Sequence, residues 1–311
     1  MSRSMLFETR ANGKLLLTGE YFVLDGATAL AIPVRFGQSL IVEARDQPNV
    51  LVWESRDWDN SVWFSAEYEL PYLGVVETND RSVAEMLASI FRDCQRQNPT
   101  FLSGTQGMAA HTICDFPRAW GLGTSSTIIA AIARWAMVDP YPVLHNTLGG
   151  SGYDIACAYA ESPLLYRLEN EKPIVRFVAF EPPFVENLYF VYLEKKQSSR
   201  EGIVRYREKA KDNAALMSEI SNLTERILNA DTLEDFEENI REHERLVGIS
   251  LEYQPLKSRL FSDFWGEIKS LGAWGGDFVL ATSAKSEDES RKYFSEKGFG
   301  TVLRWNEMIR K

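Results

Sequence analysis

Two glycines one residue apart, followed by three hydroxyl residues, form the segment of this sequence that is best suited to chemistry. Glycine lets the backbone approach an anion closely, and the first N–H groups of a helix have no partners inside the helix. The helix dipole adds partial positive charge at that end, so a polyphosphate is a natural occupant. The segment therefore predicts a nucleotide-phosphate site, with backbone or hydroxyl contacts from Gly121, Leu122, Gly123, Thr124, Ser125 and Ser126.

This loop differs from the two best-known phosphate-binding patterns. No lysine follows the glycines as in GxxxxGK[ST], and the spacing is not that of GxGxxG after a strand. The alternative is a glycine turn that Thr124 or Ser125 caps before an ordinary core helix. The loop by itself leaves both interpretations open.

The composition sets limits on the class of protein. A chain of 311 residues with 45% apolar and 25% charged residues fits one large domain or two intimate ones. The formal net charge of -10 argues against a nucleic-acid partner or an anionic membrane surface. It is compatible with a small anionic substrate, which needs only a few local cations.

The cysteines and the length of the apolar runs indicate the cellular compartment of the protein. Cys94, Cys114 and Cys157 form no CxxC pair, so neither a disulfide framework nor a zinc site is expected. The start of the sequence lacks a signal pattern, and no stretch reaches the roughly 18 apolar residues of a membrane span. We expect a soluble, cytoplasmic protein that is a monomer or a homodimer.

The elements that must position the loop follow an α+β order: rich in strands first, mixed next, rich in helices later. A change of domain is expected at the two prolines 182–183, which gives domains 1–182 and 183–311. Strands are expected within 15–18, 21–24 and 27–34, and at 39–45, 50–53, 62–64, 107–114, 164–168, 175–180, 188–193, 278–283 and 301–304. Helices are expected at 82–96, 124–138, 154–160, 203–229, 233–248, 262–271 and 287–297.

Three segments together resemble the GHMP kinases, the superfamily named for galactokinase, homoserine, mevalonate and phosphomevalonate kinases. Residues 11–24 (ANGKLLLTGEYFVL) are similar to its first signature, PGKLxLxGEhxV. The glycine loop with Pro117 matches the second, PxxxGLGSS, and residues 271–277 (LGAWGGD) are similar to the third, SGAGGGD. The resemblance implies a two-domain α+β fold with its active site in the cleft. Its N-terminal domain would be ribosomal protein S5 domain 2-like and its C-terminal domain ferredoxin-like.

The resemblance also assigns roles to single residues. Segment 150–156 (GSGYDIA) is similar to the SGxD element, so Asp154 would be the base that accepts the proton of the substrate hydroxyl. Its alternative role is to cap the helix that follows. Lys14 would sit beside this aspartate and steady charge on the phosphoryl group, and its alternative is a solvated lysine at a strand end. Glu20 matches a family position that pairs with this lysine, and its alternative is a plain turn glutamate. Ser125 matches the Mg²⁺-binding serine.

Substrate contacts are expected from several further positions. Gly275 and Gly276 would let the backbone pass close to the active site, and Glu20 would lie near the substrate. The segment 193–200 lies where the phosphomevalonate kinase branch has a threonine-rich loop, so Ser199 and Arg200, with Lys195 and Lys196, are candidates for holding an anion. A solvated basic turn is the alternative.

Two departures from the family pattern bear on the substrate. Trp274 stands where the family has glycine, so its ring either narrows the substrate pocket or turns outward. Val143 occupies the position from which some members supply a second Mg²⁺-binding carboxylate. These changes point to altered substrate choice or to a member that has lost catalysis.

The expected function is an ATP- and Mg²⁺-dependent kinase of a small acid. Mevalonate or phosphomevalonate, on the route to isoprenoids, is the expected acceptor by resemblance. Diphosphomevalonate decarboxylase shares the fold and uses ATP, so a lyase is one alternative. A binding protein that kept the fold without the chemistry is another.

Overall fold

A computed structural model describes residues 4–195, 199–209 and 214–310 of the chain. None of the helices in this described part is long and apolar enough to cross a membrane. The strands are β1 (Met5–Leu16), β2 (Ala29–Arg45), β3 (Val50–Arg56), β4 (Val62–Glu69), β5 (Gly74–Thr78), β6 (Gly107–Cys114), β7 (Leu164–Glu169), β8 (Lys172–Phe177), β9 (Leu188–Tyr192), β10 (Ile268–Ser270), β11 (Phe278–Thr282) and β12 (Val302–Arg304).

The helices gather mainly in the second half of the chain. The α-helices are α1 (Arg81–Gln97), α2 (Thr124–Ala136), α3 (Pro140–Thr147), α4 (Tyr153–Tyr159), α5 (Ser199–Lys209), α6 (Ala214–Leu228), α7 (Leu233–Leu251), α8 (Leu256–Leu260), α9 (Glu287–Glu296) and α10 (Trp305–Met308). Short 3-10 helices occur at η1 (Phe22–Asp25), η2 (Arg118–Trp120) and η3 (Val185–Asn187).

The chain divides into two compact units, each assembled from separate stretches of sequence. The first contains residues 1–13, 36–118 and 122–159, and the second contains 14–35, 119–121 and 160–311. This division differs from the boundary expected at residue 182. The early segment 14–35 joins the second unit because the start of β2 pairs antiparallel with β7, at Ala29 with Tyr166 through Ala31 with Leu164.

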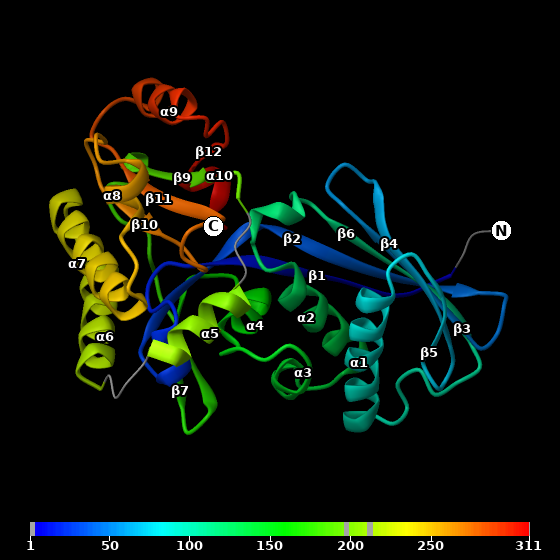
Figure 1. The fold of residues 1–311 in the computed structure, drawn as a ribbon. Coiled ribbons are helices and arrows are strands. Elements are labelled where there is room, and N and C mark those ends of the chain that lie inside the picture. The colour runs from blue at the N-terminus through cyan, green and yellow to red at the C-terminus, as the bar shows by residue number, and fades with distance from the viewer. Residues whose placement is uncertain (1–3, 196–198, 210–213, 311) are drawn as a thin grey trace. The chain divides into compact units, whose positions relative to one another are not determined.

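In the first unit, helices cover a twisted sheet with the order β5-β4-β3-β6-β2 (Figure 1). Strand β3 runs parallel to β6, and the other pairs in this order are antiparallel. Apolar residues alternate along the strands, so that Leu51 and Trp53 face a core that also contains Phe91 of α1 and Ile129 of α2. Helix α2 carries the glycine loop at its start, so this core fixes the direction of the loop's helix.

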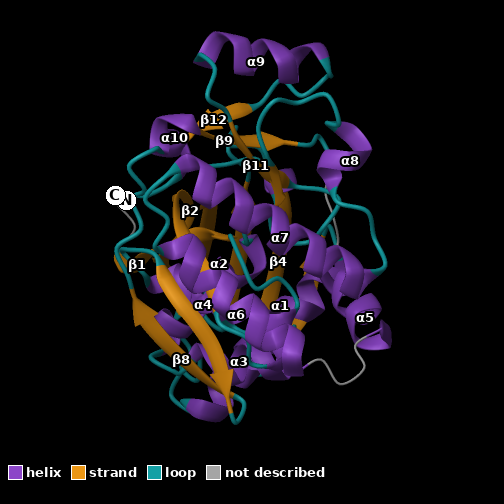
Figure 2. Cartoon of the chain, turned by 90° about the vertical axis from the view of Figure 1, so that its left-hand side faces the viewer, coloured by secondary structure: helices purple, strands orange, loops and turns teal. Residues whose placement is uncertain are grey.

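In the second unit, a small antiparallel sheet has the order β10-β11-β9-β12. Its core includes Val191, Phe261, Val279 and Phe294. Helices α6 and α7 pack against each other, as Figure 2 shows, and α7 also contacts β10. A second apolar cluster joins Phe22, Tyr206, Leu223 and Val247 from η1, α5, α6 and α7.

Most of the expected elements are confirmed, and two are wrong. The helix expected at 203–229 is described as two helices, α5 and α6, on either side of residues 210–213, which lie outside the described part. The α+β class is confirmed. Residues 21–24 were expected in a strand, but Phe22–Asp25 form a 3-10 turn that ends at Gly26 in a left-handed conformation. Residues 262–271 were expected to be helical, but Ile268–Ser270 form β10, which pairs with β11. Helix α3 was not predicted, although Asp139 caps its start by accepting the Tyr141 N–H.

Candidate active site

The glycine loop leads directly into α2, and no side chain of the described residues caps the start of this helix. Gly123 is the N-cap residue and has a left-handed backbone with φ 97°. Ser125 is exposed, whereas Ser126 is buried and its hydroxyl donates back to the Gly123 carbonyl at 2.8 Å. Ser126 could therefore meet a phosphate only through its backbone N–H. The expected alternative, a cap by Thr124 or Ser125, is wrong.

Lys14 and Asp277 both reach the first glycine of the loop. Lys14 is half-buried on β1, and its Nζ donates to the Gly121 carbonyl at 3.2 Å. Gly121 has φ 69°, and a Cβ built on it would lie 2.3 Å from the Asp277 carboxylate carbon. Only glycine fits here without displacing a neighbour. The first and third signature segments thus meet at the glycine loop, and Asp277, which ends the third, was not expected as a site residue.

The residues just before Gly121 are tied to the small sheet of the second unit. Tyr192 of β9 donates its hydroxyl hydrogen to the Ala119 carbonyl at 3.1 Å. The Trp120 ring lies edge-on to Phe278 of β11, with 5.5 Å between ring centroids. These contacts hold the entry to the loop in place, so the backbone at Gly121 is set by buried aromatic packing.

Asp154 belongs to the first unit, in the first turn of α4. Its side chain is half-buried, and one carboxylate oxygen accepts the N–H of Ile155 at 3.0 Å. Helix α4 packs against α2, and Tyr159 donates its hydroxyl hydrogen to the Ala130 carbonyl at 2.9 Å. The helix that carries the predicted base and the helix that begins at the glycine loop therefore share one core. Nearby Cys157 is fully buried, as a small core residue would be.

Glu20 belongs to a buried charged cluster, and its expected pairing with Lys14 is wrong. Its carboxylate contacts Lys269 Nζ of β10 and lies 3.5 Å from His243 Nε2 of α7. Lys269 also pairs with Glu244 at 3.1 Å. The side chains of Glu20, His243 and Lys269 are 0% exposed, so Glu20 is inaccessible to a substrate. We call Glu20, His243, Glu244 and Lys269 the Lys269 cluster.

The charges within the Lys269 cluster determine which of its side chains are protonated near neutral pH. Burial raises the pKa of Glu20 to about 7, against the opposing effect of Lys269, and burial also raises that of Glu244. Burial opposes the charge on Lys269, but Glu20 and Glu244 outweigh it and keep its pKa above the ordinary value. Two carboxyl groups face one ammonium, so one of them keeps a proton near neutral pH. Burial lowers the pKa of His243, whose Nε2 accepts the Gly19 N–H at 3.0 Å.

The raised pKa of Glu20 predicts a specific effect of pH on stability. A carboxyl group whose pKa rises from 4.5 to about 7 on folding stabilises the fold fully below pH 4.5, and this contribution is lost as the pH rises to 7. Relative to the natural protein, the Glu20→Gln variant should therefore gain about 3 kcal/mol of unfolding free energy across this range. Urea unfolding of both proteins at several pH values measures the difference.

Glu238→Gln, at an exposed position of α7, is the control for the same substitution outside the Lys269 cluster. A constant or falling difference for Glu20→Gln between pH 4.5 and 7 would contradict the assignment.

Comparison with known proteins shows what this arrangement resembles. No protein-family model and no curated protein matches the sequence. Among solved structures, Methanococcus jannaschii mevalonate kinase has a TM-score of 0.72 at 18% identity, covering 98% of both chains. Streptococcus pneumoniae phosphomevalonate kinase, in complex with phosphomevalonate and AMPPNP, has a TM-score of 0.71 at 15% identity, covering 96% of this chain and 100% of that one. This chain has the GHMP kinase fold.

The same fold also occurs in a protein that is named for a different activity. A mevalonate diphosphate decarboxylase from Legionella pneumophila has a TM-score of 0.60 at 13% identity, covering 96% of this chain and 99% of that one. The GHMP kinase fold is therefore shared by kinases and by a decarboxylase. It does not by itself decide which reaction this chain performs.

Within the GHMP kinase fold, the third signature segment forms the turn between β10 and β11. Gly275 has φ 101°, a conformation that favours glycine, and Gly276 follows it. Trp274 is turned inward, because only 6% of its surface is exposed and it packs in the cluster with Tyr21 and Val247. Of the two orientations expected for the Trp274 ring, the outward one is therefore wrong.

The basic segment expected near residue 200 is described only in part. Lys195 is exposed, and its carbonyl accepts the Asp277 N–H at 2.7 Å. Ser199 and Arg200 begin α5, but their side chains lie outside the described residues, as does Lys196. In the described ranges 4–195, 199–209 and 214–310, no three His, Cys, Asp or Glu side chains are placed to hold a metal ion together.

Proposed function

We propose that this protein is an ATP-dependent kinase that transfers the γ-phosphoryl group to a hydroxyl or phosphate group of a small acid. The main support is the uncapped start of α2 behind Gly123, with Lys14 bound to the same loop. Backbone N–H groups at a helix start, with the positive end of the helix dipole, favour a polyphosphate. The GHMP kinase fold and the three signature segments in its order agree with this.

The residues present fit a nucleotide with Mg²⁺. The N–H groups of Thr124, Ser125 and Ser126 would hold phosphate oxygens, and the exposed Ser125 hydroxyl would be a Mg²⁺ ligand. The bound nucleotide would supply the phosphoryl group. Lys14, held at the loop through the Gly121 carbonyl, brings a positive charge that would steady the transferred group.

Asp154 would act as the base that accepts the proton of the acceptor hydroxyl. A half-buried carboxylate in the first turn of α4 can orient and deprotonate an alcohol within hydrogen-bond reach. The neighbours named mevalonate kinase and phosphomevalonate kinase make mevalonate and phosphomevalonate the first acceptors to test.

Two other functions have a specific observation in their favour. The Legionella neighbour is a mevalonate diphosphate decarboxylase, which supports a lyase that consumes ATP and releases carbon dioxide. The inward ring of Trp274, where the family has glycine, supports a binding protein without catalysis.

One assay separates the three functions. The protein is mixed with Mg-ATP and a panel of compounds that includes mevalonate, phosphomevalonate, mevalonate diphosphate, other hydroxy acids and sugars. The release of ADP, the release of carbon dioxide and the binding of nucleotide are measured. ADP with a phosphorylated acceptor supports the kinase. Carbon dioxide from mevalonate diphosphate supports the lyase, and nucleotide binding without turnover of any compound supports the binding protein.

The glycine loop gives a direct test of the nucleotide site. In Gly121→Ala, the added Cβ would meet the Asp277 carboxylate at 2.3 Å, so either the loop or Asp277 must move. We expect ATP affinity to fall at least tenfold, about 1.4 kcal/mol, in calorimetric titrations. Gly149→Ala is the matched control, because its φ of 71° is nearly equal to the 69° of Gly121 but nothing lies within 4 Å of the new Cβ. Equal affinity in the two variants would argue against phosphates at this loop.

A further inference from the structure

The carboxylate of Asp277 lies against the first glycine of the glycine loop, and both residues belong to the second unit. A Cβ built on Gly121 would be within 2.6 Å of the carboxylate carbon and of both its oxygens. Gly121 precedes the N-cap residue Gly123 by two positions, so their α-carbons are at most about 7 Å apart. A negative charge therefore stands beside the start of the proposed phosphate site.

Backbone contacts hold Asp277 at this position. Its N–H donates to the Lys195 carbonyl at 2.7 Å, and its own carbonyl accepts the Leu193 N–H at 2.8 Å. Asp277 has φ 55°, a left-handed conformation in which aspartate and asparagine are enriched among residues other than glycine. The next residue, Phe278, packs against the ring of Trp120. The backbone that carries the carboxylate is thus fixed beside the loop.

Gly121 has one cationic and one anionic side chain beside it. Lys14 Nζ donates to the Gly121 carbonyl at 3.2 Å, and the Asp277 carboxylate lies at the α-carbon. Both side chains are half-buried, so water and salt screen their charges less than at the surface. Lys14 attracts a phosphate group, whereas the carboxylate by itself repels one. A carboxylate beside a phosphate site becomes favourable when a divalent cation lies between the two anions.

The position at which a second Mg²⁺-binding carboxylate was expected supplies none. Val143 of α3 stands there, and its side chain is fully buried in the apolar core of the first unit. Mg²⁺ in phosphoryl-transfer sites is usually held by one or two carboxylates together with the substrate phosphates. The Ser125 hydroxyl alone would bring the cation no negative charge from the protein.

We infer that Asp277 is the carboxylate ligand of the nucleotide-bound Mg²⁺, in place of the one that is missing at Val143. The inference rests on the proposed function, because the cation arrives with the nucleotide. It gives the third signature segment a contact with the cation, whereas the sequence indicated only a close passage of its glycine backbone. The charge of Asp277 would then favour Mg-ATP and disfavour ATP without a metal.

The Asp277→Asn variant tests this ligand through nucleotide binding, with no acceptor present. Asparagine keeps the shape and suits the left-handed backbone, but it removes the charge. In calorimetric titrations we expect the variant to bind Mg-ATP at least about tenfold more weakly than the natural protein, as for the loss of a group that holds a metal. It should bind ATP in EDTA about threefold more tightly, because a repulsion is removed.

The opposite signs of these two changes separate a metal ligand from other roles. A structural role alone would weaken the binding of both forms of ATP, and repulsion alone would let the variant bind both forms more tightly. Either result would overturn the inference. Asp277→Gly removes the same charge and also suits the left-handed backbone, so it should repeat both changes. Asp288→Asn, at an exposed position of α9 in the same unit, is the matched control and should leave both affinities unchanged.

Manganese gives a direct measurement of the ligand. Mn²⁺ takes oxygen ligands as Mg²⁺ does, and it is paramagnetic. In the presence of ADP, Asp277→Asn should lower the affinity for Mn²⁺ at least about tenfold in electron paramagnetic resonance titrations. Water should replace the lost carboxylate, so the relaxation of water protons by the bound ion should increase. Affinity and relaxation equal to those of the natural protein would contradict the assignment.

The calorimetric titrations also separate this inference from the proposed function. A natural protein that binds neither form of ATP would overturn the kinase and the ligand together. A natural protein that prefers Mg-ATP, with the same preference in Asp277→Asn, would overturn the ligand and leave the kinase intact. A preference for Mg-ATP that Asp277→Asn abolishes and Asp288→Asn retains supports the ligand, even where no acceptor is phosphorylated.

Discussion

Replacement of Asp154 by Asn is expected to slow phosphoryl transfer about a thousandfold, within the range that a general base contributes. The amide has nearly the same shape and can still accept the N–H of Ile155, which the carboxylate accepts at 3.0 Å. It cannot take a proton from an attacking hydroxyl. ATP binding should change by less than about twofold, because the helix-start N–H groups proposed to hold the phosphates are untouched.

The same substitution at another helix start controls for local effects. The Asp80 carboxylate accepts the Val83 N–H at 3.1 Å at the start of α1, so Asp80→Asn makes the same chemical change in the same unit. This variant should keep full kcat with the acceptor identified by ADP release. An Asp154→Asn enzyme that retains a third or more of the natural kcat would exclude Asp154 as the base. Its role would then be limited to the helix start.

Replacement of Lys269 by Met is expected to lower the unfolding free energy by about 3–5 kcal/mol at pH 8, since it leaves buried carboxylates without a counter-charge. Lys269 is fully buried and contacts both Glu20 and Glu244, which are also buried. The loss should be smaller at pH 5, where both carboxyl groups can hold a proton. Urea unfolding at the two pH values measures both effects.

Two control variants test whether the unpaired charges are the cause. Lys257→Met removes a lysine that is 2.8 Å from Glu267, but Arg241 holds the same carboxylate oxygen at 2.6 Å. That variant should lose about 1 kcal/mol or less. Adding Glu20→Gln and Glu244→Gln to Lys269→Met should restore much of the lost stability. A loss that does not respond to these added substitutions would assign the effect to packing instead.

The Lys269 cluster also ties the first signature segment to β10. It joins Glu20 to Lys269 by direct contact, and His243 accepts the N–H of Gly19. Tyr21 follows Glu20 directly, and Trp274 lies shortly after Lys269 in the sequence. The cluster thus fixes the backbone next to Tyr21, whose ring packs with Trp274 in one apolar cluster.

The sequence by itself determined the local secondary structure and turns of this protein. Apolar residues at helical spacing predicted residues 82–96, and α1 spans Arg81–Gln97. The glycine and hydroxyl pattern predicted the loop and the helix from Thr124. The motif at residues 271–277 was linked to the loop only through family resemblance, and the structure brings its Asp277 to Gly121. These predictions were correct because helix caps, turns and apolar periodicity depend on residues that lie close together in the chain.

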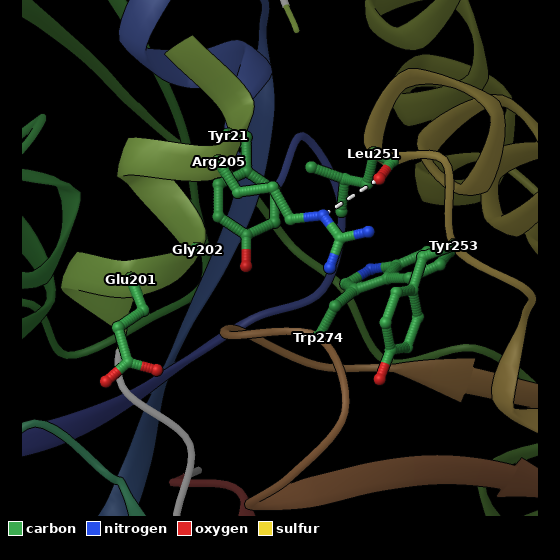
Figure 3. A pocket seen from close by; sticks show the side chains of 7 residues that line it. All are labelled: Tyr21, Glu201, Gly202, Arg205, Leu251, Tyr253 and Trp274. Carbon is green, nitrogen blue, oxygen red and sulfur yellow. Dashed lines mark hydrogen bonds between the residues drawn. The ribbon is translucent and has the colours of Figure 1, made fainter. Parts of the chain in front are cut away.

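Only the tertiary structure determined which partner each polar side chain contacts. Glu20 was expected beside Lys14, but its partner Lys269 comes from β10, a strand in a segment that was expected to be helical. Tyr21, Arg205 and Trp274 lie far apart in the sequence, but they line one small pocket (Figure 3). No local pattern marks a buried ion pair or the lining of such a pocket, because both arise from packing between distant segments. Spacing along the chain therefore predicted the glycine loop, while long-range packing decided the partners of Glu20 and the position of the Trp274 ring.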